Sequence, residues 1–337
     1  MNITDGNGVM DVQANTSGNL NKKSKPGRAA RRRKAKERSI NEALDQLLSG
    51  NNSSLTISSH DSALPSDRSE SLASVVSLRN KLNVNFEDDE RRLVSQLGFF
   101  PGNAITISSR VVDLKDTYPH LHSLLLNNKM KHVDVDCAEQ DKYPTTLQLY
   151  PLAIRNVHLG GKQGRKYKSR KRGHDGNSVA VNSSDENSKK EPQTLENSTV
   201  LEPFPTMYWL THPILRVLIS RIELGDSDNV MEMERRLSSS QSNLLQMQRA
   251  HESYGRARWD LLTEDDTKDV MQRKWNDAIG TCKGVAGIKR YQTIKCLHTH
   301  AAHYLATMNK VDENDENIVG RWVMEVVERQ VQNMKDE

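Results

Sequence analysis

The sequence predicts an α+β protein, in which a small mixed β region precedes a mainly helical C-terminal half and a long disordered tail lies at the N-terminus. Three observations predict it. No Phe, Trp or Tyr precedes Phe86, and all four tryptophans lie at or after Trp209. Between residues 86 and 159 short segments alternate apolar and polar residues, which is the period of a strand. Beyond Pro203 apolar residues recur at helical spacing.

The N-terminal 85 residues are polar and rich in Ser and Asn, so they cannot bury enough apolar surface to offset the entropy of the chain. We therefore predict disorder for residues 1–85. Within them a basic run at 22–38 holds ten Lys and Arg residues and one acid. One short helix is predicted over 40–48, where the apolar residues share a face.

The folded domain is predicted to span residues 86–332. Its first helix carries Leu93 and Leu97 on one face and ends at Gly98. Strands are predicted over 105–108, 133–137 and 147–157, the last with a proline that confines it to an edge or a bulge. A disordered basic loop is predicted at about 160–201, because seven basic residues and no acid occupy 162–172.

The C-terminal half is predicted to be helical in five segments. The first begins with Pro213 in its opening turn and ends at Gly225. A long polar helix follows over 228–262, and a shorter one surrounds Trp275. Two further segments with helical apolar spacing cover 294–308 and 319–327.

The formal net charge of +4 is unevenly distributed along the chain. Residues 22–38 contribute +9 and residues 162–172 contribute +7, which leaves −12 on the remainder. Such basic runs serve as nuclear import signals or as weak, non-specific nucleic-acid contacts, and they also occur as solvated tails that keep an acidic domain soluble. We expect a nuclear or cytoplasmic protein. The candidate basic residues are Arg31, Arg32, Arg33, Lys34, Arg170, Lys171 and Arg172.

Several classes of protein are excluded by the sequence. No apolar run reaches the 18 or so residues of a membrane span, and the first residues lack the order of a signal peptide, so we expect no membrane association. Cys137, Cys282 and Cys296 have unrelated spacings, which suggests neither a disulfide framework nor a paired-cysteine zinc site. Gly284 and Gly287 are too sparse for a phosphate loop, and we predict no cofactor.

Three separated motifs occur in an order that resembles a known family. They are residues 203–213, residues 250–254, and residues 295–298 with Ala302 and His303 beyond. Together they resemble domain-of-unknown-function family 501, over roughly residues 87–327 with long insertions. The resemblance implies a shared fold and shared positions, and it implies no particular reaction.

The shared residues suggest a polar pocket between helices. His251 shares a helix face with Tyr254 and Arg258, and His298 lies at the edge of an apolar face. We predict that His251, Tyr254 and His298 are catalytic, since a partly buried imidazole suits acid and base work. Hydrogen-bonded core histidines are the alternative. Predicted ligand-binding residues, for an anion, are His212, Arg258, Lys295 and Arg321.

A metal site is the less favoured use of the C-terminal motif. On one helix Cys296, His300 and His303 would fall in one sector, and thiolate and imidazole are ligands that zinc accepts. The alternative is a small packed cysteine with hydrogen-bonded histidines at a helix interface.

Two classes of function follow from the sequence, and whether the protein is an enzyme stays open. The first is a non-catalytic interaction or regulatory protein with an unknown protein partner and basic targeting segments. The second is a small enzyme or ligand-binding protein that acts on an anionic ligand through the His, Tyr and Arg pocket. The lack of a nucleophile and base at a typical spacing slightly favours the first.

Overall fold

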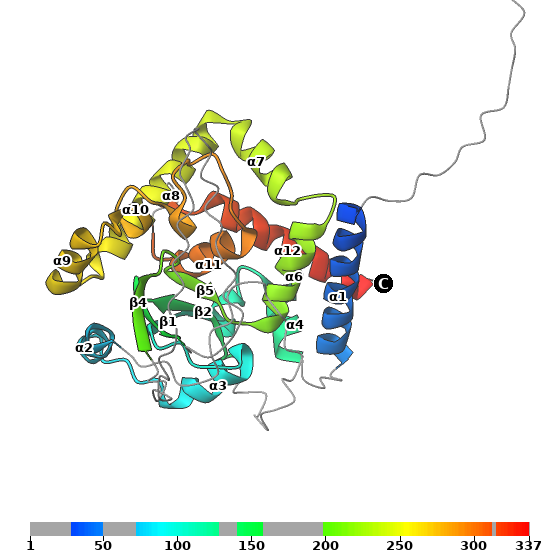
Figure 1. The fold of residues 1–337 in the computed structure, drawn as a ribbon. Coiled ribbons are helices and arrows are strands. Elements are labelled where there is room, and N and C mark those ends of the chain that lie inside the picture. Colours follow the sequence, from blue (N-terminus) through cyan, green and yellow to red (C-terminus); the bar gives the residue numbers. More distant parts are fainter. Residues whose placement is uncertain (1–27, 50–71, 128–139, 158–197, 312–314, 337) are drawn as a thin grey trace, which may run out of the picture.

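The computed structural model describes residues 28–49, 72–127, 140–157, 198–311 and 315–336, and it confirms the predicted α+β class. Figure 1 shows short strands in the middle of the molecule with helices around them. The elements of the N-terminal part are α1 (Arg28–Ser49), α2 (Ala73–Lys81), α3 (Glu87–Leu97), β1 (Ala104–Arg110), the 3₁₀ turn η1 (Val111–Leu114) and α4 (Pro119–Asn127).

The strands that follow, with the helices after them, complete the described chain. These elements are β2 (Pro144–Leu149), β3 (Leu152–Val157), β4 (Ser198–Pro203), β5 (Tyr208–Leu210), α6 (Pro213–Leu224), α7 (Val230–Ser238), α8 (Gln241–Asp260), α9 (Glu264–Gln272), α10 (Asn276–Ile279), the short turn η2 (Val285–Gly287), α11 (Leu297–Thr307) and α12 (Ile318–Asp336). Among them no helix is long and apolar enough to cross a membrane.

Within the described residues, two antiparallel sheets form the β region. The first has the strand order β1-β2-β5, with Leu147 of β2 opposite both Ile107 of β1 and Trp209 of β5. The second pairs β3 with β4. The sequence predicted one strand over 147–157, whereas β2 ends at Leu149 and β3 begins at Leu152. Pro151 lies between them, and because proline has no amide hydrogen it interrupts strand pairing.

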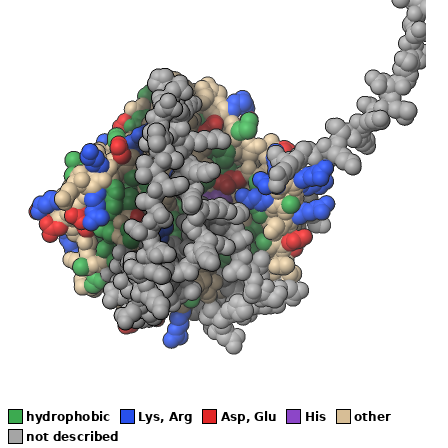
Figure 2. Space-filling model, viewed as in Figure 1, with side chains coloured by type: hydrophobic (Ala, Val, Ile, Leu, Met, Phe, Trp, Pro, Cys, Tyr) green, Lys and Arg blue, Asp and Glu red, His purple; other side chains and the backbone are tan. Residues whose placement is uncertain are grey.

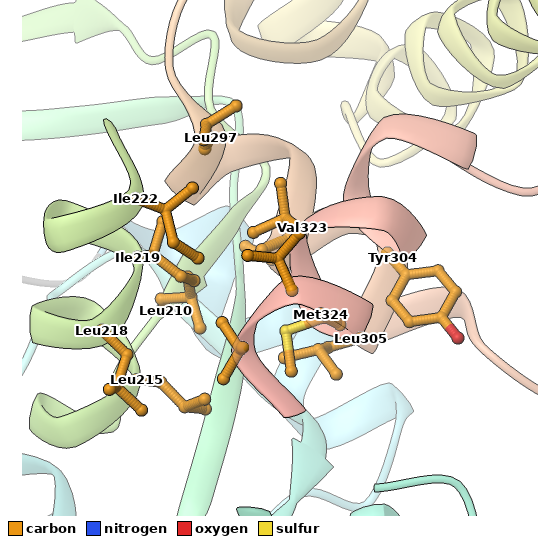
Figure 3. Close-up of a cluster of buried hydrophobic side chains, with 14 of the residues drawn as sticks. Leu210, Leu215, Leu218, Ile219, Ile222, Leu297, Tyr304, Leu305, Val323 and Met324 are labelled. Carbon is orange, nitrogen blue, oxygen red and sulfur yellow. The ribbon is translucent and has the colours of Figure 1, made fainter. Parts of the chain in front are cut away.

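The main core lies between α6, α11 and α12. Figure 3 shows Leu215, Ile219 and Ile222 of α6 turned toward α12, from which Val323 and Met324 project. All five side chains are buried, as the helical spacing in the sequence predicts. Burial of apolar surface contributes about 25 cal/mol per Å², so these side chains stabilise the packing of the three helices.

The helix α1 extends further toward the N-terminus than predicted. The sequence predicted a helix over 40–48 within a disordered tail, but α1 already begins at Arg28 and includes most of the basic run. Ala43, Leu44 and Leu47 are buried against α6, beside which α1 lies in Figure 1. The Arg33 guanidinium donates to the carbonyl oxygens of Leu224 (2.8 Å) and Gly225 (3.0 Å) at the end of α6. A cation there satisfies the last carbonyls of the helix.

Other predicted boundaries also differ from the structure. The helix α2 lies within the range predicted as disordered. The predicted helix over 228–262 is two helices, because Ser240 caps α8 by accepting a hydrogen bond from the amide of Asn243. The predicted strand over 133–137 lies outside the described residues. So do most of the predicted basic loop and residues 1–27 and 50–71 of the predicted tail.

Candidate functional site

A cavity of about 480 Å³ lies where the first sheet meets α8 and α11. Tyr208 from β5, Tyr254 from α8 and His303 from α11 form its aromatic part. Among the described residues, Lys310 and Asp315 supply its charged groups. The remaining lining residues are Thr106, Ile107, Ser108, Gln148, Met207, Ser253, Ala257, Ala306, Thr307 and Val311.

The three aromatic side chains pack against one another. The Tyr208 and His303 rings are stacked, with centroids 5.8 Å apart and an interplanar angle of 6°. The edge of Tyr254 meets both rings, at 4.9 Å from His303 and 5.9 Å from Tyr208. Such contacts each contribute about 0.5–1.5 kcal/mol beyond the burial of area. The rings therefore form a rigid wall of the cavity.

Backbone amides hold the hydroxyl of Tyr254. The amide of Met207 donates to its oxygen over 2.5 Å. Burial raises the pKa of Tyr254 to about 12, although the amides of Met207, Tyr208 and Ala286 and the Arg258 charge oppose this shift. Ala286 has a positive φ of 54°, which is unusual for a residue with a Cβ. Tyr254 is thus a neutral phenol in a fixed orientation.

Behind this wall Asn317 links two imidazoles. Its Oδ1 accepts from the amide of Gly320 (3.0 Å) and lies 3.2 Å from Nδ1 of His300. Its Nδ2 lies 3.0 Å from Nδ1 of His303. All three side chains are buried, with His303 at 4% exposure and the others at 0%. A Cβ at Gly320 would overlap the carbonyl oxygen of His300, so only glycine allows α12 to approach α11 this closely.

His251 lies next to this group, on α8. The amide of Val285 donates to its Nδ1 (3.0 Å), and its ring meets that of His300 edge to face at 5.8 Å. The Nε2 atoms of His251 and His300 are buried and form no hydrogen bond within the described residues. Gly284 lies against the His251 ring so closely that a Cβ there would overlap it.

Burial lowers the pKa of each of these imidazoles, because a charged ring loses its hydration. The pKa falls to about 2 for His251, about 4 for His300 and about 3 for His303. Neighbouring histidines lower it further for His251 and His303. His212, at the start of α6, has a pKa of about 3 for the same reason of burial. We call these four the buried histidines, and all are neutral at pH 7.

The predicted catalytic set is only partly brought together. Tyr254 lines the cavity, and His251 lies behind its wall. His298 lies elsewhere, where its Nδ1 is 3.1 Å from Glu223 and its Nε2 is 3.0 Å from the carbonyl oxygen of Arg216. Burial raises the pKa of Glu223, but hydrogen bonds from His298 and from amides at the start of α11 lower it overall. His298 thus joins α11 to α6, and the prediction that it shares a pocket with His251 is corrected.

Arg258 is a structural residue rather than the predicted ligand-binding one. Its side chain is fully buried, and burial lowers its pKa. Its guanidinium donates only to backbone carbonyls within the described chain, namely those of Pro205, Ile279, Gly280, Lys283 and Gly284. With its donors directed at the 279–284 loop, it holds that loop against α8.

The other predicted anion-binding residues also lie away from the cavity lining. His212, the residue directly before α6, is buried, with 3% of its surface exposed. Lys295 Nζ donates to the carbonyl oxygen of Ala286 over 3.5 Å. Arg321 pairs with Glu316 (3.2 Å) and Glu325 (3.8 Å). The predicted convergence of these residues with Tyr254 is therefore corrected.

The predicted metal ligands do not form one site. Cys296 precedes α11 in an extended conformation, and its Sγ lies 3.3 Å from the hydroxyl of Thr299. The two histidines instead turn toward Asn317. In the part of the chain that the structure describes, no group of three His, Cys, Asp or Glu residues is arranged to hold a metal ion. The prediction placed Cys296 on one helix face with His300 and His303. Because α11 begins at Leu297, the cysteine does not share that face.

The predicted basic residues on α1 fall into two groups. Arg31, Arg32 and Lys34 are exposed, and Figure 2 shows Lys and Arg side chains gathered at the N-terminal part of α1. Arg33 instead anchors α1 to α6. The predicted residues 170–172 lie outside the described residues.

Sequence reasoning missed Asn317, Tyr208 and Lys310. Tyr208 lies in the first motif, at 203–213, and begins the short strand β5. Asn317 comes directly before α12 and three residues before Gly320, a spacing typical of a polar residue that caps a helix. No sequence pattern identifies Lys310 as a site residue, because its position at the cavity depends on how α11 packs against β1.

The fold and the site define an α+β protein whose first sheet, α8 and α11 bound a cavity with Tyr208, Tyr254 and His303 on one wall. A family model described as Protein of unknown function (DUF501) matches residues 169–325. The resemblance predicted from the motifs is confirmed over this segment, which starts later than the predicted residue 87. No curated protein and no solved structure matched the chain.

Proposed function

We propose that this protein binds a small, polar, uncharged molecule in the cavity between the first sheet, α8 and α11. One observation carries the proposal. Tyr208, Tyr254 and His303 come from three motif segments that are far apart in the sequence, and they meet on one cavity wall. A pocket of some hundreds of Å³ with aromatic walls and a few fixed polar groups is typical of small-molecule sites.

The charges around the cavity support an uncharged ligand. Lys310 and Asp315 have opposite signs, and Lys310 Nζ already donates to the carbonyl oxygens of Ser108 (2.8 Å) and Ala306 (3.1 Å). The arginines and the lysine predicted to bind an anion face other partners. A buried anion without a dedicated positive partner loses its hydration at a large cost. The earlier expectation of an anionic ligand is therefore replaced by that of a neutral one.

This proposal selects the ligand-binding alternative of the sequence prediction. The favoured prediction, a non-catalytic interaction or regulatory protein, stays a prediction. The proposal covers binding alone. The aromatic side chains are neutral and rigidly held, which suits recognition.

The proposal is tested by filling the cavity. Ala257 is exposed on α8 and lines the cavity, so Ala257→Trp should occupy it without disturbing the core. Ala35→Trp, at an exposed position of α1, is the matched control. A library of neutral and charged fragments is screened against the full chain by ligand-observed NMR. We expect neutral hits that are lost in Ala257→Trp and kept in Ala35→Trp. Hits that survive in Ala257→Trp, or the absence of any hit, would contradict the proposal.

The exposed basic residues of α1 support a second, independent role in localisation. Arg31, Arg32 and Lys34 are exposed on a helix that Arg33 and the apolar face of α1 fix to α6. A cluster of cations at fixed positions is suited to an acidic partner surface, such as that of a nuclear import receptor. We propose that this cluster directs the protein to the nucleus.

A further inference from the structure

We propose that His303 presents a permanently protonated Nε2–H to the cavity, and that the atom of the ligand it binds is a carbonyl oxygen. This inference rests on the proposed function and names the chemical class of the ligand. The ligand would be a ketone, an amide or an ester, because their oxygen accepts hydrogen bonds and cannot donate one.

The backbone amide of Gly320 determines the orientation of the Asn317 side chain. An amide N–H only donates, so the Asn317 atom 3.0 Å from it is the carbonyl oxygen Oδ1. The other end of the side chain, which approaches His303, is then the NH₂ group. An assignment that is normally ambiguous for an asparagine is fixed here by one neighbour.

The orientation of Asn317 in turn fixes both imidazoles. Its NH₂ group donates to Nδ1 of His303 (3.0 Å), so that nitrogen carries no proton. A neutral imidazole has one N–H, and for His303 it must be on Nε2. Nδ1 of His300 approaches Oδ1 of Asn317 (3.2 Å) and is therefore the donor. The two rings have opposite tautomers as a result.

The surroundings keep His303 in this state. His251, with its Nδ1 bound by the Val285 amide, and His300 are the titratable groups behind the ring, and both are neutral. Tyr208 is stacked on one side and Tyr254 lies edge-on. His303 lines the cavity, and Nε2 is the ring nitrogen that Asn317 leaves available.

A fixed donor in a desolvated wall selects its ligand. If the ligand offers an acceptor, the donor exchanges water for that acceptor at a modest gain. If the ligand offers none, the N–H stays unpaired, which weakens binding about five- to 100-fold. The remaining hydrogen of Lys310 Nζ also favours an acceptor, since its other two are directed at Ser108 and Ala306. A carbonyl oxygen, with two lone pairs, meets both requirements.

The tautomer is measured first and without any ligand. The full chain is labelled with ¹⁵N-histidine, and the His303 signals are assigned by their loss in His303→Gln. We expect a protonated Nε2 and an unprotonated Nδ1 for His303, and the reverse for His300. A protonated Nδ1 on His303 would overturn the inference, whatever the cavity binds.

The ligand class is measured next with two probes of nearly equal shape. Acetophenone has a carbonyl oxygen where α-methylstyrene has a CH₂ group. We expect acetophenone to bind about five- to 100-fold more tightly, because α-methylstyrene leaves the N–H without an acceptor. Equal affinities, or no binding of acetophenone while other fragments bind, would overturn the carbonyl assignment. Failure of every fragment would instead contradict the proposed function.

A variant that reverses the tautomer links the two measurements. In Asn317→Asp the carboxylate accepts from Gly320 and His300 and needs a donor from His303, so the His303 proton should move to Nδ1. The preference for acetophenone should then disappear. Asn276→Asp, at an exposed position of α10, is the control and should keep it. If Asn317→Asp does not fold, the measurements on the unaltered chain still decide the inference.

Discussion

Replacing Arg258 with methionine should destabilise the protein strongly, because this arginine organises the 279–284 loop. The methionine side chain is nearly as long as that of arginine but is apolar, so it occupies much of the same space without donating a hydrogen bond. The carbonyl groups of the loop and of Pro205 would lose their donor in an environment where Arg258 itself has no exposed surface. Buried acceptors without partners raise the free energy of the folded state.

The magnitude follows from two opposing terms. Five hydrogen bonds to a charged donor, at a lower limit of about 1.5 kcal/mol each, contribute roughly 7 kcal/mol. Desolvation of a buried guanidinium without a carboxylate costs several kcal/mol and is recovered in the variant. We therefore expect Arg258→Met to lower the free energy of unfolding by about 3–4 kcal/mol.

Urea denaturation at pH 7, followed by circular dichroism, measures this change. Arg256→Met is the matched control, since Arg256 is exposed on the same helix and should change stability by less than about 0.5 kcal/mol. Arg258→Lys should recover only part of the loss, because an ammonium group cannot reach the same set of carbonyls. A loss below about 1 kcal/mol for Arg258→Met would refute the structural role assigned to this residue.

Three further predictions test other parts of the account. Gly320→Ala should lower stability by about 1–3 kcal/mol, because its Cβ would overlap the His300 carbonyl; an unchanged melting temperature would contradict the close helix crossing. The pKa of each of the buried histidines lies below the unfolded value of about 6.5, so the unfolded state binds more protons below that pH. The stabilisation is then fully present above pH 6.5, and each buried histidine should lower the free energy of unfolding by about 1 kcal/mol between pH 6.5 and 5.5. A urea midpoint that does not change over this range would disprove their neutrality. Replacing Arg31, Arg32 and Lys34 with glutamine, with Arg33 kept to hold α1, should abolish nuclear accumulation of a fluorescent fusion, and an unaltered distribution would remove the targeting role.

The sequence predicts the elements of this fold better than it predicts where they end. Apolar spacing locates α6, α11 and α12, because their buried faces are long and regular. The break between α7 and α8 is marked by Ser240, whose side chain accepts a hydrogen bond from the amide of Asn243, and periodicity does not detect such a cap. The basic part of α1 is too polar for a helix of its own. It is helical because it continues a face that packs on α6.

The candidate site is predictable in its components and not in its assembly. Motifs identify His251, Tyr254 and His303 as residues of interest. Helical spacing also predicts that His298 and Cys296 lie on this helix with His303. In the structure His298 instead contacts Glu223 of α6, away from the cavity lining, and Cys296 precedes the helix. Which side chains share a cavity depends on the crossing of α8, α11 and the sheet. That crossing is set by contacts between distant segments, about which helical and strand periodicity gives no information.

The wall formed by Tyr208, Tyr254 and His303 is proposed to bind a small molecule through the Nε2–H of His303. The most direct test is a titration of the ¹⁵N-histidine-labelled full chain with acetophenone. The account predicts that the Nε2 signal of His303 shifts and saturates, that the His298 signals stay unchanged, and that Ala257→Trp abolishes the shift. A His303 signal that does not move while acetophenone binds, or a shift that persists in Ala257→Trp, would contradict it.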